Sequence, residues 1–282
     1  MINVGNVSFS YTKAPFINHI SFQVARGEIF GFLGPSGAGK STLQKILIGM
    51  LTNYTGSAVV DGIEVKHHTN SFYENIGIDF EFPSLYEKLT AKQNLMYFSS
   101  LYSGKKRNIE ELLKKVDLIH DADKKVSDFS KGMKSRLNFI KAIVHNPDIL
   151  FLDEPTSGLD PTNSRLLKDM ILAEKASGKT IILTTHNMED ATELCDRVVF
   201  IVDGNMKAMD TPHNLIMRRG AGKLRYTYWK DGEECMRECS LDNTHNDSLL
   251  QSLIQRNELL TIHSQEQTLG DIFMEVTGRR LS

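Results

Sequence analysis

Apolar and polar residues alternate in several segments near the start of the chain. Residues 4–9 and 20–24 both show this alternation, which predicts half-buried β-strands. Residues 59–65 alternate around Asp61-Gly62, a dipeptide typical of tight hairpin turns. The first part of the chain is therefore predicted to form an antiparallel β subdomain.

Farther along the chain, short apolar runs replace the alternating pattern. Residues 28–33 are mostly apolar, and residues 149–152 and 180–184 are continuous runs of the kind that is buried in a parallel sheet. A helical pattern at about 162–177 separates the last two runs, which predicts a βαβ unit. Residues 92–145 carry apolar side chains at helical spacing, so a helical insertion is expected to interrupt this α/β core.

The pattern changes again after about residue 222. Residues 224–230 and 234–239 flank a turn and predict a hairpin, while residues 249–254 and 269–277 have the spacing of helices. We therefore expect a small C-terminal α+β appendage over residues 222–282.

Composition limits the possible partners. The chain has 282 residues, which is enough for one large domain and a small appendage, and 40% of them are hydrophobic. Lys and Arg number 33 against 35 for Asp and Glu, so the net charge of −2 provides no polybasic surface and no nucleic-acid partner is expected. No apolar run approaches the roughly 18 residues that span a bilayer, so the chain is not predicted to cross a membrane.

The N-terminus and the cysteines indicate the compartment. The first residues have neither the basic start nor the apolar core of a signal peptide. Cys195, Cys235 and Cys239 are odd in number and lack the pairing of a zinc site. A reducing cytosol is therefore expected, with Cys235 and Cys239 interpreted as ordinary thiols; a metal pair or a disulfide is the alternative.

Residues 34–42 follow the pattern G-x-x-x-x-G-K-[ST], which is typical of a loop that binds nucleotide phosphates. Its glycines let the backbone approach the phosphates, and the N–H groups at the start of the next helix face their negative charge. Lys40 adds a cation, and Ser41 is the candidate ligand for Mg²⁺. The candidate residues for binding ATP are Gly34, Pro35, Ser36, Gly37, Ala38, Gly39, Lys40, Ser41 and Thr42.

Two features next to this loop argue against a chance match by a glycine-rich turn. An apolar strand precedes it, and apolar residues at helical spacing follow it. Asp153 and Glu154 come directly after another predicted strand, at the end where open α/β sheets place their ligand chemistry. We assign Asp153 to Mg²⁺ and Glu154 to the attacking water of a phosphoryl transfer; a plain surface turn is the alternative.

Several ordered motifs resemble those of the ATP-binding cassette (ABC) ATPases, the nucleotide-hydrolysing subunits of transporters. Residues 150–160 are similar to the Walker B strand and D-loop of this family, and His186 is similar to its switch histidine. Residues 129–133 align with its L-S-G-G-Q signature, and Tyr11 stands where an aromatic ring stacks on adenine. The resemblance covers about residues 2–235 and implies a P-loop NTPase core of ABC type, with a helical subdomain at about 82–146.

The resemblance also implies how the site is completed. In this family two ATP-binding domains face each other head to tail, and each ATP lies between the phosphate loop of one chain and the signature of the other. Ser130 and Gly132 are then candidates to contact the γ-phosphate across the interface. His186 would sense the same phosphate, and Asp160 would link the two sites. The resemblance implies two kinds of partner: a second nucleotide-binding chain, expected to be an identical copy, and separate integral membrane permease subunits.

Two positions depart from the family pattern. Glu81 stands where a glutamine normally coordinates Mg²⁺, and it would bring a negative charge to the metal; a surface acid without that role is the alternative. In the signature, Lys131 replaces a glycine and Met133 replaces a glutamine. We favour an orientation of Lys131 toward solvent over one toward the phosphate.

Glutamate at position 81 resembles the variant of exporters that confer resistance to bacitracin and lantibiotics, and residues 270–279 are similar to the tail of drug exporters. The resemblance implies an ATPase on the cytoplasmic face of the membrane that drives export of a drug, an antimicrobial peptide or a lipid. One alternative is a soluble ABC ATPase that acts on ribosome or DNA complexes, although no basic arm or long heptad pattern is present. A nucleotide-binding regulator without turnover is disfavoured because Glu154 and His186 are both present.

Overall fold

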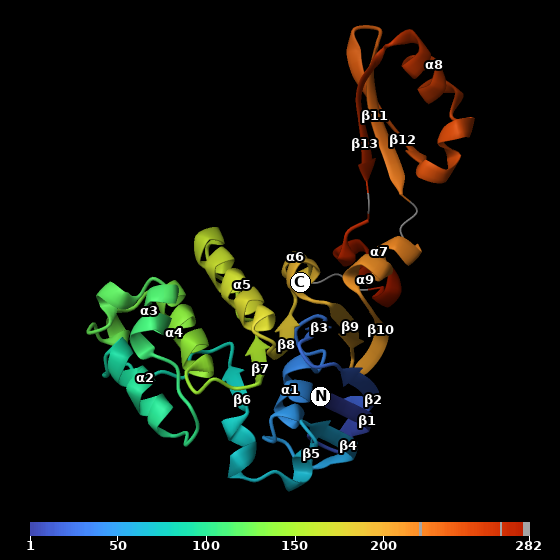
Figure 1. Ribbon diagram of the computed structural model, residues 1–282. Helices are drawn as coiled ribbons and strands as arrows, with labels where there is room; N and C mark the ends of the chain where they lie inside the picture. The colour runs from blue at the N-terminus through green and yellow to red at the C-terminus, as the bar shows by residue number, and fades with distance from the viewer. Residues whose placement is uncertain (220–221, 266, 279–282) are drawn as a thin grey trace. The chain divides into compact units, whose positions relative to one another are not determined.

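The computed structural model describes residues 1–219, 222–265 and 267–278 (Figure 1). The chain divides into two compact units, one from Met1 to Met209 and one that begins at Asp210. Arg279, the last residue of the exporter-like tail, lies outside the described residues. Within the described ranges, no helix combines the length and the apolar character that a membrane span requires.

The first unit contains the antiparallel β subdomain that the alternating pattern predicts. Its sheet has the order β2-β1-β4-β5, and the paired strands are antiparallel. Asp61 and Gly62 form the hairpin turn between the last two strands with φ of 50° and 82°, values that suit aspartate and glycine. The strands are β1 (Ile2–Phe9), β2 (Ile17–Val24), β4 (Tyr54–Val60) and β5 (Ile63–Glu64).

A six-stranded sheet with the order β10-β9-β3-β8-β7-β6 forms the α/β core. The apolar runs predicted as strands are β3, β7 and β8, and these pair in parallel with one another and with β6 and β9. The strands are β3 (Ile29–Leu33), β6 (Ile76–Asp79), β7 (Ile149–Asp153), β8 (Thr180–Thr185), β9 (Arg197–Val202) and β10 (Asn205–Asp210).

Packing on both faces explains why the central strands are apolar throughout. Phe30, Phe32 and Phe151 join one buried cluster with the β subdomain and with α1 (Lys40–Leu47). Gly31 lies between the two phenylalanines, and a Cβ atom there would lie 2.7 Å from the Sγ atom of Cys195. The strand therefore needs a glycine where α6 (Met188–Leu194) and the residue after it approach most closely.

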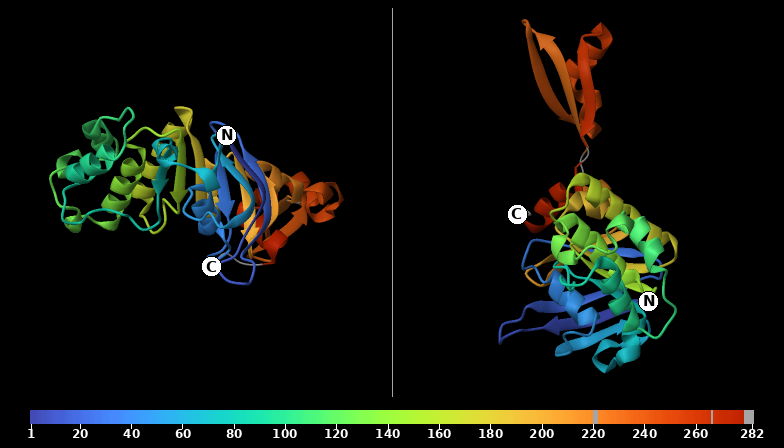
Figure 2. Two further views of the ribbon diagram at one scale, coloured as in Figure 1. Left: turned by 90° about the horizontal axis from the view of Figure 1, so that it is seen from below. Right: turned by 90° about the vertical axis from the view of Figure 1, so that its left-hand side faces the viewer.

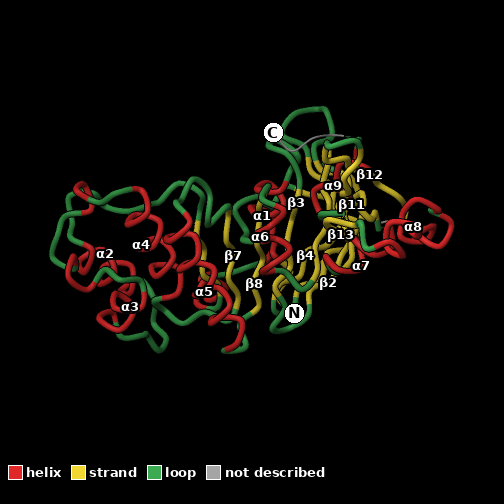
Figure 3. The backbone as a smooth tube through the Cα atoms, turned by 90° about the horizontal axis from the view of Figure 1, so that it is seen from above, coloured by secondary structure: helices red, strands yellow, loops and turns green. Residues whose placement is uncertain are grey.

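The helical insertion lies beyond the β6 edge of this sheet, and Figure 3 shows its helices grouped together. α4 contacts β6 and also contacts α2, α3 and α5 (Pro161–Ala176). Side chains at the helix starts fix the boundaries: Thr90 and Gln93 form a capping box, Asn108 caps the next helix, and Ser130 caps the third. The insertion contains α2 (Ala91–Ser100), α3 (Ile109–Lys115) and α4 (Lys131–Ile143), which confirms the helical pattern.

The second unit contains a three-stranded antiparallel sheet with the order β12-β11-β13. Figure 2 shows strands of this unit beside a helix. Leu224, Tyr226 and Tyr228 alternate along β11 and pack against Leu250 and Leu253 of α8. The strand β13 was not predicted from the sequence. The elements are α7 (Pro212–Arg219), β11 (Lys223–Lys230), β12 (Glu233–Ser240), α8 (Ser248–Arg256), β13 (Leu259–Gln265) and α9 (Leu269–Thr277).

The border of this unit lies at residue 210, whereas the sequence pattern placed it near 222. The helix α7 accounts for the difference, because it contacts α9 of the same unit. The predicted bounds of the ATP-binding domain (2–235) and of the C-terminal appendage (222–282) stay predictions.

A buried polar network joins β6 to the helical insertion. Asn138 of α4 donates hydrogen bonds to the Asp79 carboxylate and, at 3.1 Å, to the carbonyl oxygen of Phe80. The Lys141 ammonium donates to Asn138 Oδ1 at 2.7 Å. Burial raises the pKa of Asp79 to about 7, although the Lys141 charge and the Asn138 hydrogen bond oppose this rise.

This pKa predicts a pH-dependent stability effect. Between the unfolded pKa of about 3.9 and the folded value of about 7, the folded protein retains a proton that the unfolded chain has lost, so the contribution of Asp79 to stability falls as pH rises. Asp79→Asn carries no charge at any pH. When the pH is raised from ~5 to ~8, the free energy of unfolding of this variant should therefore increase by about 1–3 kcal/mol relative to that of wild type.

Denaturant unfolding of both proteins at the two pH values measures this difference. Asp123→Asn, at an exposed acid of the helical insertion, is the control and should show no comparable change with pH. An Asp79→Asn difference that is the same at both pH values would contradict the assignment.

Candidate functional site

The loop between β3 and α1, which are labelled in Figure 1, has glycine conformations that suit an anion-binding loop. Gly37 and Gly39 have φ of 77° and 108°, which residues with a Cβ rarely adopt. A Cβ atom on Gly34 would lie 2.1 Å from the carbonyl oxygen of Ile201. The glycines of the motif are therefore required by the path of the loop, which leads directly into the first turn of α1 at Lys40.

Lys40 is a buried cation at the base of this loop. Its ammonium donates to the carbonyl oxygens of Gly34 at 2.7 Å and Pro35 at 3.1 Å. Burial lowers the pKa of Lys40, and the negative charges of Glu154 and Asp153 oppose that effect. A cation with little water around it attracts an anion more strongly than a solvated one does.

Two acids at the C-terminal end of β7, Asp153 as its last residue and Glu154 directly after it, lie beside the loop and contact residues from other elements. Asp153 accepts a hydrogen bond from Ser41 Oγ at 3.2 Å and another from the hydroxyl of Thr184 on β8. Glu154 has φ of 51°, in the left-handed region, and its Oε1 lies 2.9 Å from Nδ1 of His186. The structure thus brings together Ser41, Asp153, Glu154 and His186, as the motif spacing predicts.

A cleft of about 280 Å³ opens over the loop and contains most of the candidate residues. Glu81 lines the same cleft, so the residue at the glutamine position is adjacent to the phosphate loop. The lining residues are Phe16, Ser36, Gly37, Ala38, Gly39, Lys40, Ser41, Thr42, Glu81, Glu154 and His186.

Two aromatic residues lie at the side of this cleft. Tyr11 is 56% exposed and lies outside the lining residues, but its hydroxyl is 3.1 Å from Thr42 Oγ1 and its ring contacts the ring of Phe16 edge-on. Phe16 lines the cleft itself and was not among the residues singled out from the sequence. The sequence held one signal for Phe16, because it is a second aromatic residue close to Tyr11 in the same loop.

The two signature residues and Asp160 of the D-loop do not line the cleft of their own chain. Ser130 accepts a hydrogen bond from the Met133 N–H at 3.2 Å and caps α4, while Gly132 lies within the first turn of that helix. Asp160 caps α5 by accepting from the N–H groups of the two residues that follow Pro161. Within one chain, these three residues are therefore not brought to the phosphate loop.

Lys131 is exposed, as the favoured orientation toward solvent requires, and its ammonium also lies beside the D-loop. A Cβ atom on Gly158, whose φ is 65°, would lie 2.1 Å from Lys131 Nζ. The Lys131 ammonium therefore lies against Gly158 of the same chain.

Comparison with known proteins gives consistent matches. A family model described as ABC transporter matches residues 17–157. A fluoroquinolones export ATP-binding protein of Mycobacterium tuberculosis is 47% identical over 100% of this chain and 95% of its own. The linearmycin resistance ATP-binding protein of Bacillus subtilis is 31% identical over 100% of this chain and 99% of its own.

A solved structure extends the match to the fold. It is a dimeric, post-hydrolysis state of an ATP-binding cassette bound to ADP and Pi; it is 25% identical to this chain, with a TM-score of 0.66 over 75% of this chain and 98% of that one. The chain belongs to the ABC transporter family, as one of its ATP-binding and ATP-hydrolysing subunits.

Proposed function

We propose that Glu154 is the catalytic carboxylate of ATP hydrolysis in this chain. Closing of the dimer on ATP and its opening after hydrolysis would drive export through separate membrane subunits. The observation that carries the proposal is the position of the Glu154 carboxylate. It lines the same cleft as Lys40 and Ser41, and it contacts His186 at 2.9 Å. An acid in this place can orient a water molecule toward a phosphate held by the loop.

The loop and the surrounding side chains have separate roles in binding ATP. Backbone N–H groups of the loop and the N-terminus of α1 are proposed to face the phosphates, and Lys40 would neutralise part of their charge. The Tyr11 ring is available to stack on the adenine because it is exposed, and Phe16 extends the same aromatic surface.

The side chains fit a magnesium ion that is shared with the nucleotide. Among the described residues, no group of three or more His, Cys, Asp or Glu side chains is arranged to hold a metal ion alone. Mg²⁺ commonly uses one or two protein ligands, water and phosphate oxygens, and when bound it neutralises charge on the phosphates. Ser41 and Asp153, which are hydrogen-bonded to each other, and Glu81 are the proposed ligands, Asp153 acting through water.

A second copy of the chain would complete each site. Ser130 and Gly132 are proposed to contact the γ-phosphate bound by the partner, with the start of α4 directed at that charge. Asp160 would connect the two sites at the dimer interface. The dimeric state of the related cassette supports this arrangement.

Export is proposed from the relatives. One is named for fluoroquinolones export and the other for linearmycin resistance, so a drug or other antimicrobial compound is the proposed class of substrate. Separate permease chains would form the path through the membrane, and this chain would act at their cytoplasmic face.

The first test replaces the proposed catalytic acid. Glu154→Gln keeps the shape of the side chain but cannot accept a proton from water, so steady-state ATP hydrolysis should fall by at least about 100-fold. ATP binding should persist, and the dimer should accumulate in its closed form. Phosphate release and gel filtration with ATP measure these outcomes, with Glu111→Gln, at an exposed acid of α3, as the control. Near-normal hydrolysis by Glu154→Gln would contradict the assignment.

The second test addresses the charge at position 81. Glu81→Gln removes one negative ligand, so the Mg²⁺ concentration that gives half-maximal hydrolysis should rise by roughly 3- to 10-fold. Binding of ATP without metal should change little. A magnesium titration of the ATPase measures the shift, and an unchanged titration together with unchanged transport would exclude a role for Glu81.

A further inference from the structure

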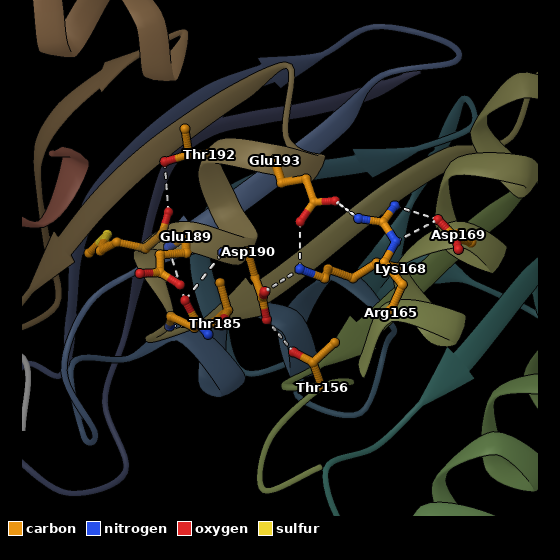
Figure 4. A network of polar contacts seen from close by, with 11 residues as sticks. Thr156, Arg165, Lys168, Asp169, Thr185, Glu189, Asp190, Thr192 and Glu193 are labelled. Carbon is orange, nitrogen blue, oxygen red and sulfur yellow. Dashed lines mark hydrogen bonds and ion pairs between the residues drawn. The ribbon is translucent and has the colours of Figure 1, made fainter. Parts of the chain in front are cut away.

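A polar network next to the cleft ties together three segments that are separate in sequence (Figure 4). The Thr156 hydroxyl donates to Asp190 Oδ2 at 2.6 Å. The other oxygen of Asp190 lies 3.1 Å from the ammonium of Lys168. The network therefore joins the turn after β7 to α6 and α5.

Asp190 is the centre of this network. It is only 4% exposed, and a buried carboxylate is costly unless its oxygens are paired. Thr156 and Lys168 each satisfy one of its two oxygens. Removing either partner would leave a polar atom of Asp190 without compensation.

Each end of the Thr156–Asp190 hydrogen bond is close to a residue of the proposed catalytic pair. Thr156 follows Glu154 by two positions, in a turn closed by the Ser157 N–H donating to the Glu154 carbonyl at 3.1 Å. At the other end, Asn187 directly follows His186 and accepts the N–H of Asp190 at 3.2 Å. The hydrogen bond thus connects the two short segments that carry Glu154 and His186.

The backbone of Glu154 makes such a connection necessary. Its φ of 51° is costly for a residue with a Cβ, and this conformation persists only where neighbouring contacts hold it. One contact is the Glu154 N–H, which donates to the Thr184 carbonyl at 3.0 Å. Thr156 supplies a second restraint on the other side of the residue.

The outer part of the network differs from its centre. Lys168 also bonds Glu193 at 2.5 Å, and Arg165 pairs with both Glu193 and Asp169. The Arg165 side chain is 52% exposed, so these outer ion pairs are screened by water and contribute little. Any effect on the site should therefore come from Asp190, Thr156 and Lys168.

A hollow of about 400 Å³ is lined both by Glu154 and His186 and by Thr156, Lys168 and Asp190. The network thus forms part of the wall beside the proposed reacting groups. A shift of Thr156 or Asp190 would be transmitted over only two to four residues to Glu154 and His186.

We propose that Thr156 and Asp190 are positioning residues for ATP hydrolysis, which hold Glu154 in contact with His186, and that Lys168 is the half-buried countercharge of Asp190. The inference rests on the proposed role of Glu154. It predicts that loss of the Thr156 hydroxyl impairs the hydrolytic step and leaves ATP binding in place.

The test compares matched variants of the full chain. Thr156→Val keeps the shape of the side chain and removes the donor, so kcat for ATP hydrolysis should fall roughly 10- to 100-fold, the range expected when a reacting group is misplaced. The KM for ATP should stay within about twofold. Thr156→Ser retains the hydroxyl and should restore most of kcat. Thr156→Ala, which places no methyl group against Asp190, should repeat the loss if the valine variant is too unstable to purify.

Thr192→Val is the matched control. The Thr192 hydroxyl, also drawn in Figure 4, donates to the Met188 carbonyl within α6 at 2.7 Å and not to Thr156, Asp190 or Lys168, so kcat should be unchanged. Equal losses in Thr156→Val and Thr192→Val, or a fall in kcat explained by a lower melting temperature, would overturn the inference.

A double variant separates this inference from the proposed function. In a Glu154→Gln background, Thr156→Val should produce no further loss, because the group that it positions is already inactive. A full additional loss would show that Thr156 acts elsewhere. If Glu154→Gln alone remains active, the proposed function fails; if Glu154→Gln is inactive while Thr156→Val is normal, only the positioning role fails.

Discussion

Parallel pairing of β3, β7 and β8 is the constraint on which the site depends. The carboxyl ends of parallel strands meet at one edge of a sheet, so the residues that follow them are neighbours in space. Here they are the phosphate loop, the Asp153-Glu154 pair and His186. Buried apolar side chains on both faces fix the register of these strands, and the register in turn fixes the distances between the catalytic candidates.

The charges that one chain supplies to the site do not balance those of a bound polyphosphate. Lys40 is desolvated and lies near Asp153, Glu154 and Glu81, so its positive charge is opposed by several negative ones. A polyphosphate held there would benefit from further positive charge or N–H donors. Magnesium and the start of α4 from a second chain are the proposed sources, which gives an electrostatic reason for a site that one chain leaves incomplete.

The sequence predicted the features that depend on local pattern. The glycine loop, the apolar strands and the hairpin at Asp61-Gly62 all follow from short-range rules. Phe16 and the Thr156–Asp190 hydrogen bond were missed because they depend on which loops the fold brings together. β13 was missed because its pairing with β11 comes from tertiary context. The second unit begins earlier than the sequence pattern indicated because α7 contacts α9 and so belongs to this unit.

We propose that each ATP site is shared by two chains, and mixing two inactive variants shows whether it is. Lys40→Met damages the phosphate loop and Ser130→Arg damages the signature, so each variant alone should be inactive. In a dimer that contains one of each, the intact loop of the second faces the intact signature of the first. Steady-state ATP hydrolysis should therefore reappear on mixing. A mixture that forms dimers and remains inactive, or full activity of Ser130→Arg alone, would contradict the account.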